Sequence, residues 1–256
     1  MHVLVVGATG TVGRHVAAQA VGSGHSARAL VRDLPRAQLL LPPSTELVLG
    51  DGTDPTTLPR AVDGVDAVVF AHGSHGAPGD AERIDYGVVH HVLDTLGPRR
   101  ARIALMTSIG VTVHDGGYNR STHGHDWKRR AERLVRRSGH PYTIVRPGWF
   151  DYNRDDERRL VFLQGDKRRS GGPSDGAVAR DQIARVLLAA LTCPAAEHKT
   201  FELIAEPGSE QEDLDPLFAA LVADPPGGYD GPLDPDTLPL AAEPERVRAE
   251  LDALTG

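Results

Sequence analysis

The chain has 256 residues, 40% of them hydrophobic and 25% charged, a composition typical of a large globular domain and not of a disordered chain. Its 28 Lys and Arg against 35 Asp and Glu residues give a formal net charge of -7, which disfavours nucleic acid and anionic membrane surfaces as partners. The single cysteine, Cys193, excludes an internal disulfide and a cysteine-rich zinc site, and it fits a cytoplasmic setting. We expect no membrane span, because no apolar run approaches the roughly 18 residues that crossing a bilayer requires.

Short apolar runs alternate with helix-compatible stretches in the first part of the chain. Strands are expected at 2–6, 27–31, 47–49, 67–70 and 103–106, and helices at 14–22, 34–41 and 84–96, with a further short segment at 58–62. The strand-like runs are continuously apolar, which indicates burial on both faces. The sequence therefore predicts an α/β fold with a mostly parallel sheet covered by helices.

The second part of the chain divides at about residue 205. A helix is expected at 127–138, a strand at 142–145, a helix at 179–191 and a strand at 201–204. The polar segment 151–176 is expected to form loops or short strands that wall the substrate site. Residues 1–205 should thus form the main domain, and 206–256 an acidic, Pro-rich appendage with helices at 214–222 and 245–254 and a flexible link at 225–228.

A glycine-rich turn, GATGTVG at 7–13, follows the first expected strand. Gly7 permits the tight turn, Gly10 lets a phosphate approach the backbone, and Gly13 allows the next helix to pack closely on the strand. The free N–H groups and the dipole at that helix start favour negative charge. The pattern predicts a dinucleotide site, although such glycines also serve ordinary turns.

The residue after the second strand bears on the choice of dinucleotide. An acidic residue there would hold the ribose 2′-hydroxyl of NAD(H), but this chain has Arg32, and Arg14 follows the glycine turn. Guanidinium groups hold phosphate in a bidentate manner, so we expect NADP(H) in preference to NAD(H). The alternatives are that both arginines are solvated surface charges and that the neighbouring Asp33 selects NAD(H).

Six short motifs occur together: GATGTVG at 7–13, VRD at 31–33, GD at 50–51, MTSIG at 106–110, WKRRAE at 127–132 and YTIVRPGW at 142–149. As a set, they resemble the NmrA-like, NAD(P)H-binding branch of the atypical short-chain dehydrogenase/reductases. The resemblance covers about residues 1–205. It implies a Rossmann-like, doubly wound sheet with the cofactor across the carboxyl ends of its strands.

The resemblance also implies cofactor contacts. Asp51 would lie near the adenine, although it can equally be a turn residue. Ala71 and Gly73 would line the adenosine side, Thr107 and Ser108 would approach the nicotinamide, and Pro147 and Gly148 would support its carboxamide. The expected cofactor-binding residues are Gly7, Thr9, Gly10, Thr11, Val12, Gly13, Arg14, Arg32, Asp51, Gly52, Ala71, Gly73, Thr107, Lys128, Pro147 and Gly148.

Ser108 and Lys128 match the family's catalytic serine and lysine, but Gly124 stands where the family's proton-donating tyrosine would be. Hydride transfer to an isolated ketone forms a strongly basic alkoxide that needs an acid, whereas a quinone or flavin gives a delocalised anion. We therefore expect an NADPH-dependent reductase of a small conjugated electrophile (quinone, flavin or enone), with Ser108 as hydrogen-bond donor and Lys128 as positive charge. His125, whose unperturbed pKa is near 6.5, is an alternative proton donor. Tyr118, in a Gly-rich loop, can in principle fold inward.

A basic run begins at Lys128. Only Lys128 matches a motif position, so it alone is expected at the cofactor. The rest of the run is typical of a solvated helix face that the acidic tail can pair with. The residues expected on that surface are Arg129, Arg130, Arg133, Arg136 and Arg137.

Aromatic residues follow the expected strand at 142–145. Trp149 is expected either in the core or as one wall of an aromatic pocket. Phe150, Tyr152 and Phe162 are candidates for apolar contact with a substrate, which should be a small aromatic or conjugated molecule.

Two other classes of function compete with a reductase. The chain has twelve histidines, but none lies in an HExxH pattern, so we expect no metal site. The absent tyrosine is also compatible with a non-catalytic, NAD(P)-binding redox sensor of the NmrA-like kind, with the acidic tail as its partner surface. The presence of both Ser108 and Lys128 favours the enzyme.

Overall fold

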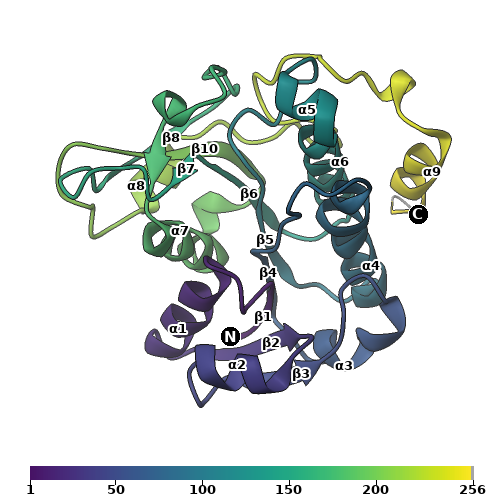
Figure 1. The fold of residues 1–256 in the computed structure, drawn as a ribbon, viewed down its shortest axis with the longest axis vertical. Helices are drawn as coiled ribbons and strands as arrows, with labels where there is room; N and C mark the ends of the chain where they lie inside the picture. The colour runs from purple at the N-terminus through teal and green to yellow at the C-terminus, as the bar shows by residue number, and fades with distance from the viewer. Residues whose placement is uncertain (255–256) are drawn as a thin grey trace.

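The structure, a computed structural model, describes residues 1–254, so the last two residues of the expected appendage lie outside the described residues. A ten-stranded sheet runs between two layers of helices (Figure 1). The strands are β1 (His2–Val6), β2 (Ser26–Val31), β3 (Glu46–Leu49), β4 (Ala67–Phe70), β5 (Arg102–Met106), β6 (Tyr142–Pro147), β7 (Trp149–Phe150), β8 (Arg159–Leu163), β9 (Ala177–Val178) and β10 (Lys199–Glu206).

The sheet has the expected doubly wound topology. Strands β1 to β6 are parallel and lie in the order β3-β2-β1-β4-β5-β6, followed by β10-β9-β7. Strand β10 is parallel to β6 but antiparallel to β8 and β9. The strand order reverses between β1 and β4, which is where ligands bind in open sheets of this type. The predicted Rossmann-like, mostly parallel fold is confirmed.

The helices are α1 (Gly13–Gly22), α2 (Leu34–Leu40), α3 (Pro59–Val62), α4 (Gly87–Leu96), α5 (Gly117–Thr122), α6 (Gly124–Arg137), α7 (Arg180–Thr192), α8 (Asp215–Ala219) and α9 (Glu245–Ala253). A π-helical turn at Ala81–Tyr86 precedes α4, so the helix expected at 84–96 is α-helical only from Gly87. The sequence does not predict α5, because its Gly, Asn, Ser and Thr residues are weak helix formers. Within the described residues, no helix is both long and apolar enough to cross a membrane.

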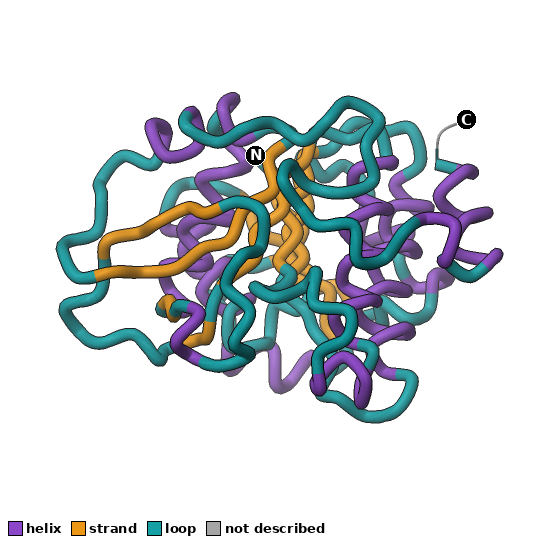
Figure 2. Tube along the Cα trace, turned by 90° about the horizontal axis from the view of Figure 1, so that it is seen from above, coloured by secondary structure: helices purple, strands orange, loops and turns teal. Residues whose placement is uncertain are grey.

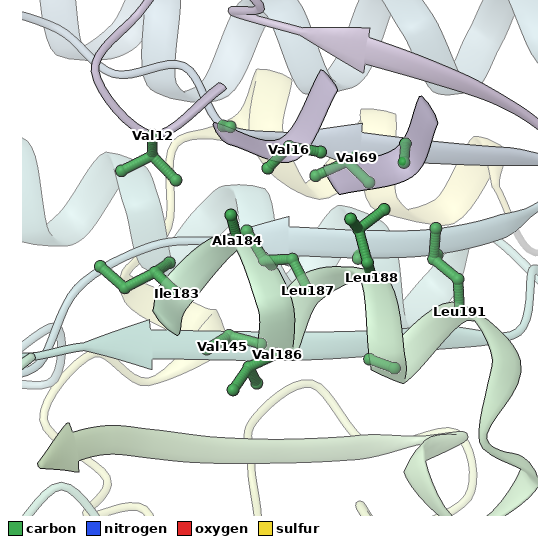
Figure 3. Packing of buried hydrophobic residues seen from close by; sticks show 14 of the residues in the cluster. Val12, Val16, Val69, Val145, Ile183, Ala184, Val186, Leu187, Leu188 and Leu191 are labelled. Carbon is green, nitrogen blue, oxygen red and sulfur yellow. The ribbon is translucent and has the colours of Figure 1, made fainter. Parts of the chain in front are cut away.

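Each face of the sheet packs against its own helices. Successive residues of a strand point to opposite faces, so Val3 and Val5 join one core while Leu4 and Val6 join the other. The first core lies under α1 and α7; Figure 3 shows Ile183, Leu187 and their neighbours of α7 lying between α1 and the central strands. The second lies under α3, α4 and α6. Seen from above, the strands form the centre and helices lie on both sides (Figure 2). Burial on both faces explains why the strands are continuously apolar.

The C-terminal segment crosses from one face of the sheet to the other (Figure 1). Phe218 of α8 belongs to the first core, and Val247 and Leu251 of α9 belong to the second. Between these helices the segment follows α6 from its end towards its start, because Asp224 pairs with Arg136 and Asp230 pairs with Arg133 and Arg129. The appendage is therefore packed on the main domain, as expected. The domain boundary at 205 and the flexible link at 225–228 stay predictions.

Four of the five arginines on the basic face of α6 are buried, so the prediction of a solvated face is wrong for them, while Arg137 is half-buried. Arg129 and Arg133 are each only 1% exposed, and Arg130 and Arg136 are also buried. Arg130 and Arg133 both donate to Glu243 at 2.6 Å. A guanidinium can be buried only when carboxylates and carbonyls take up its charge and donors, and the C-terminal segment supplies these acceptors. The expected pairing with the acidic tail thus exists, but it occurs in the interior.

Arg146 of β6 lies at the centre of this charge network. It is 0% exposed and donates to Glu132 of α6 at 2.7 Å, to Asp234 of the C-terminal segment at 2.7 Å and to Glu202 of β10 at 3.3 Å. Burial lowers the pKa of the arginine, but the charges of Glu132 and Asp234 outweigh this and raise it well above the ordinary value. The same cation lowers the pKa of Asp234 to about 2 against the opposing effect of burial. Arg146 therefore joins the sheet, α6 and the C-terminal segment.

We predict that Arg146→Met destabilises the fold by about 3–5 kcal/mol, because it leaves buried carboxylates without their cation. The measurement is the free energy of unfolding from urea denaturation at pH 7. The matched control is Arg154→Met. The side chain of Arg154 is 67% exposed and pairs with Asp156, so this substitution should cost at most about 1 kcal/mol. Equal losses for the two variants would contradict the role given to Arg146.

Candidate functional site

The glycine turn between β1 and α1 is packed too closely for other residues. Gly7 has φ 85°, and a Cβ there would lie 2.7 Å from the backbone nitrogen of His72. A Cβ on Gly13 would lie 2.2 Å from the carbonyl oxygen of Gly7. Gly10 donates its N–H to that same oxygen at 2.9 Å. The turn therefore brings the start of α1 directly against the end of β1, as predicted from the glycine spacing.

Two backbone amides at this turn are free to bind an anion. Among the described residues, the N–H groups of Thr11 and Val12 have no hydrogen-bond partner. No side chain caps α1 either. Unpaired amides at a helix start attract phosphate through hydrogen bonds and the helix dipole. The residues present therefore fit the pyrophosphate of a dinucleotide.

A cavity of about 350 Å³ opens beside the turn. It lies between the start of α1 and the start of α7, where the chain leaving β6 also passes. Its lining residues are Thr11, Arg14, His15, Asp151, Arg180 and Asp181. Sequence reasoning missed the last three, because only the packing of α7 against α1 brings them to the glycine turn, and it also missed His15, which lies two residues after Gly13.

Arg14 and Arg32 are exposed and make no ion pair with any described residue, so both remain available to an anion. Asp33 instead caps α2, because its Oδ1 accepts the N–H of Arg36 at 3.0 Å. This cap engages one carboxylate oxygen at the position where an acidic residue would hold a ribose hydroxyl.

Asp51 and Gly52 form the turn after β3. One oxygen of Asp51 accepts both the N–H and the hydroxyl of Thr53, each at 2.9 Å. Burial raises the pKa of Asp51, but these hydrogen bonds and the charge of Arg32 hold it below its usual value. A Cβ on Gly52 would lie 2.7 Å from Val88 of α4. The turn role of Asp51 is therefore present, and its contact with adenine stays a prediction.

Lys128 reaches from α6 to Asp85 of the π-helical turn, which also binds the loop after β4 that holds Ala71 and Gly73. Its ammonium lies 2.7 Å from the buried carboxylate of Asp85, and that carboxylate also accepts the N–H and hydroxyl of Ser74. The side chain of Lys128 is 16% exposed. The lysine thus lies at the strand ends and outside the solvated face, although a cofactor would have to share it with Asp85. Nothing in the sequence pattern links Asp85 to Lys128.

The end of β5 holds Ser108 between two fixed residues. Thr107 donates its hydroxyl to Glu132 at 2.7 Å, so that side chain belongs to the buried charge network. Ile109 donates its N–H to Pro147 of β6 at 3.0 Å. The half-buried hydroxyl of Ser108 makes no hydrogen bond with another described residue. Ser108 is therefore fixed by its neighbours while its own hydroxyl remains available.

Asp166 braces the loop that follows Ser108. Its fully buried carboxylate accepts the N–H of Gly110 at 2.7 Å and both the N–H and hydroxyl of Thr112 at 2.8 Å. The backbone N–H of Asp166 donates to Glu202 at 3.1 Å. Sequence reasoning missed this residue, which lies 56 positions from Gly110 inside the polar segment 151–176.

Tyr118 lies over Gly124, the position without the family's tyrosine. A Cβ on Gly124 would be 2.7 Å from the Tyr118 hydroxyl oxygen. The Tyr118 ring also packs on His125, with centroids 4.8 Å apart. Burial lowers the pKa of His125 despite its contact with the carbonyl of Val113. The His125 ring is therefore largely neutral at pH 7, which weakens its case as a proton donor.

At the end of β6, Pro147 and Gly148 are tightly packed. A Cβ on Gly148 would lie 2.3 Å from the carbonyl oxygen of Gly176. Phe162 is not at the site, because its ring stacks on Phe201 at 4.2 Å within the first core. Trp149 is partly exposed, which excludes the first of its two expected positions, the core, and its role as one wall of an aromatic pocket stays a prediction.

The N–H donors and close-packed glycines of this site agree with comparisons to known proteins. The sequence signature of NAD(P)H-binding proteins matches residues 7–194. The chain belongs to this NAD(P)H-binding family. The expected kinship with atypical short-chain dehydrogenase/reductases is thereby confirmed for family and fold, while the NmrA-like branch stays a prediction.

The individual proteins that are similar to this chain share 24–30% of its sequence. Sanguinarine reductase from Eschscholzia californica is 26% identical over 216 residues, which cover 68% of this chain and 78% of that protein. NAD(P)H azoreductase from Xenophilus azovorans is 30% identical over 212 residues, which cover 78% of this chain and 66% of that protein. A candidate NAD-dependent epimerase/dehydratase from Bacillus halodurans has a similar fold, with a TM-score of 0.71 and 24% identity over 86% of this chain and 100% of that one.

Glu202 connects the charge network to the candidate site through Asp166. Burial raises the pKa of Glu202 to about 7; Arg146 opposes this, and the charge of Asp166 adds to it. Between pH 4.5 and about pH 7, the folded state therefore holds a proton on Glu202 that the unfolded chain has lost. The stabilisation from this group is complete below the ordinary pKa of 4.5 and is lost as the pH rises through 7.

We predict that Glu202→Gln gains stability relative to the unmodified chain as the pH rises from 5 to 8, by at most about 1.4 kcal/mol per pH unit. Urea unfolding at four pH values across this range measures it. Glu206→Gln, on the same strand but paired with exposed Arg159, is the control and should show no such trend. If the relative stability of the Glu202→Gln variant is independent of pH, the raised pKa is wrong.

Proposed function

We propose that the chain is an NADPH-dependent reductase that transfers hydride to a small conjugated electrophile of the quinone, flavin or enone type. The observation that carries the proposal is the glycine turn with the unpaired amides of Thr11 and Val12, in a chain of the NAD(P)H-binding family. Two relatives named as reductases, sanguinarine reductase and NAD(P)H azoreductase, support the reaction class.

The chain's own residues would hold the cofactor along the carboxyl edge of the sheet. The turn residues Thr9 to Gly13 would bind the pyrophosphate, and Arg14 and Arg32 would bind the 2′-phosphate. Asp51 to Gly52, Ala71 and Gly73 would line the adenosine side, and Thr107, Pro147 and Gly148 the nicotinamide side. When bound, NADPH supplies a hydride to an electron-poor atom of the substrate.

We predict that Arg32→Ala raises the dissociation constant for NADPH about tenfold or more and leaves that for NADH nearly unchanged. The reason is that a charge-assisted contact to the 2′-phosphate is worth about 1.5–3 kcal/mol and NADH lacks that phosphate. Fluorescence titration with both coenzymes measures the change. Arg248→Ala, an exposed arginine on α9, is the control. Tighter binding of NADH than NADPH by the unmodified chain would reject the preference for NADPH.

Ser108 and Lys128 would stabilise the negative charge that develops on the reduced substrate. The unengaged hydroxyl of Ser108 can donate a hydrogen bond to a substrate oxygen or nitrogen. The ammonium of Lys128 would lower the energy of the anion from one side, with Asp85 holding it in place. A delocalised anion needs no strong acid from the protein, so largely neutral His125 is not required.

We predict that the protein oxidises NADPH with quinones and not with simple ketones. Ser108→Ala should lower kcat/KM for a quinone about 100-fold, because it removes a donor to the developing anion. His125→Ala, the matched control on α6, should change it less than about threefold. The assay follows NADPH absorbance. Ketone turnover that depends on His125 would overturn the substrate class. Tight NADPH binding with no turnover of any electrophile would favour the redox sensor.

A further inference from the structure

An exposed pair of aromatic rings follows β6. Trp149 is 38% exposed and Tyr152 is 64% exposed, and their rings meet edge to face with centroids 5.8 Å apart at 81°. Single exposed aromatic residues are common, but two large rings in contact and both open to solvent leave apolar faces in water at a free-energy cost. The pair therefore has the properties of a binding surface.

A strained backbone holds this pair in place. Asp151, between the two aromatic residues, has φ 58°, a left-handed conformation that costs energy for a residue with a side chain. Its N–H donates to Val178 of β9 at 3.1 Å, and its carboxylate accepts the N–H of Arg180 at 2.9 Å and pairs with the Arg180 guanidinium. These contacts with β9 and α7 maintain the kink. The kink turns the chain so that Tyr152 meets Trp149.

The pair follows the strand that is hydrogen-bonded to the residue after Ser108. Pro147 accepts the N–H of Ile109, so β6 and the residues around Ser108 are joined at that rung. Trp149 is two residues further, which in an extended chain is about 7 Å. Phe150 packs against the core under α1 and α7, and successive strand residues alternate between faces. Trp149 therefore lies on the other side of β7, away from that core.

We propose that Trp149 and Tyr152 form a stacking surface for the ring system of the substrate, and that they select fused, polycyclic conjugated electrophiles over single-ring ones. This inference rests on the proposed reductase function. An electron-poor fused ring can lie on the face of Trp149 while its edge meets Tyr152, since the two rings stand nearly perpendicular. A single ring bound at Ser108 offers less ring surface to Trp149 than a fused system does. The selectivity follows from this difference in overlap.

The test compares 9,10-phenanthrenequinone with 1,4-benzoquinone. Trp149→Leu should raise the KM for the three-ring quinone about tenfold, because leucine keeps the apolar bulk and removes the stacking face. The KM for benzoquinone and the dissociation constant for NADPH should stay within about twofold. Trp149→Phe should raise the KM for the three-ring quinone much less than Trp149→Leu does, because phenylalanine keeps an aromatic face. Val222→Ala, which alters an exposed apolar residue of the C-terminal segment, is the matched control and should change neither KM.

A binding measurement separates this inference from the reductase function. The chain has two tryptophans, so Trp127→Phe leaves Trp149 as the only one. In the NADP⁺-saturated protein, phenanthrenequinone should quench Trp149 emission saturably, while benzoquinone should quench it only by collision, in proportion to concentration.

The outcomes are distinct. If both quinones are reduced and Trp149→Leu leaves the ratio of their kcat/KM values unchanged, the stacking surface is wrong and the reductase stands. If no quinone is reduced, the reductase function fails. The stacking surface is then judged from quenching alone: saturable quenching by phenanthrenequinone supports it, and quenching that is only linear in concentration overturns it.

Discussion

The ion pairs of Arg146 with Glu132, Asp234 and Glu202 determine how the carboxyl-end half of this molecule is put together. The four side chains come from β6, α6, the C-terminal segment and β10, and all are almost completely excluded from solvent. The charges of Arg146, Glu132 and Asp234 cannot be buried alone, since an unpaired ion in the interior costs several kcal/mol. The strands, the helix and the C-terminal segment therefore have to assemble together. This explains why the charged face of α6 is largely buried.

The same network reaches the candidate site by two short routes. Glu132 accepts the hydroxyl of Thr107, which directly precedes Ser108. Glu202 accepts the N–H of Asp166, whose carboxylate holds the loop after Ser108. The residue before the available serine hydroxyl and the loop after it are thus both held by groups in the charged interior. Preorganised donors of this kind are effective in catalysis because they need not reorganise when charge develops on a substrate.

What the sequence could predict was local. The glycine turn, the strands from β1 to β6 and the helices α1 and α7 follow from spacing and apolar patterns within about 20 residues. The burial of Arg133 was not predictable this way, because its partner Asp230 lies 97 positions further on and a basic helix face looks the same whether water or carboxylates cover it. Asp85 beneath Lys128 and Asp166 behind the loop were missed for the same reason. Their chemistry arises only when the fold brings distant segments together, as α7 does for Asp151 and Arg180.

The close packing of Gly148 against Gly176 makes one part of the candidate site rigid. Two backbones in direct contact leave no room for a hinge, so the β6–β7 junction and β9 behave as one rigid body. Residues 71–79, which follow β4, have no regular secondary structure. Adjustment to ligands of different shape then falls to that segment, so directed evolution toward new ligands has its most tolerant positions there and its least tolerant ones at the glycine pair.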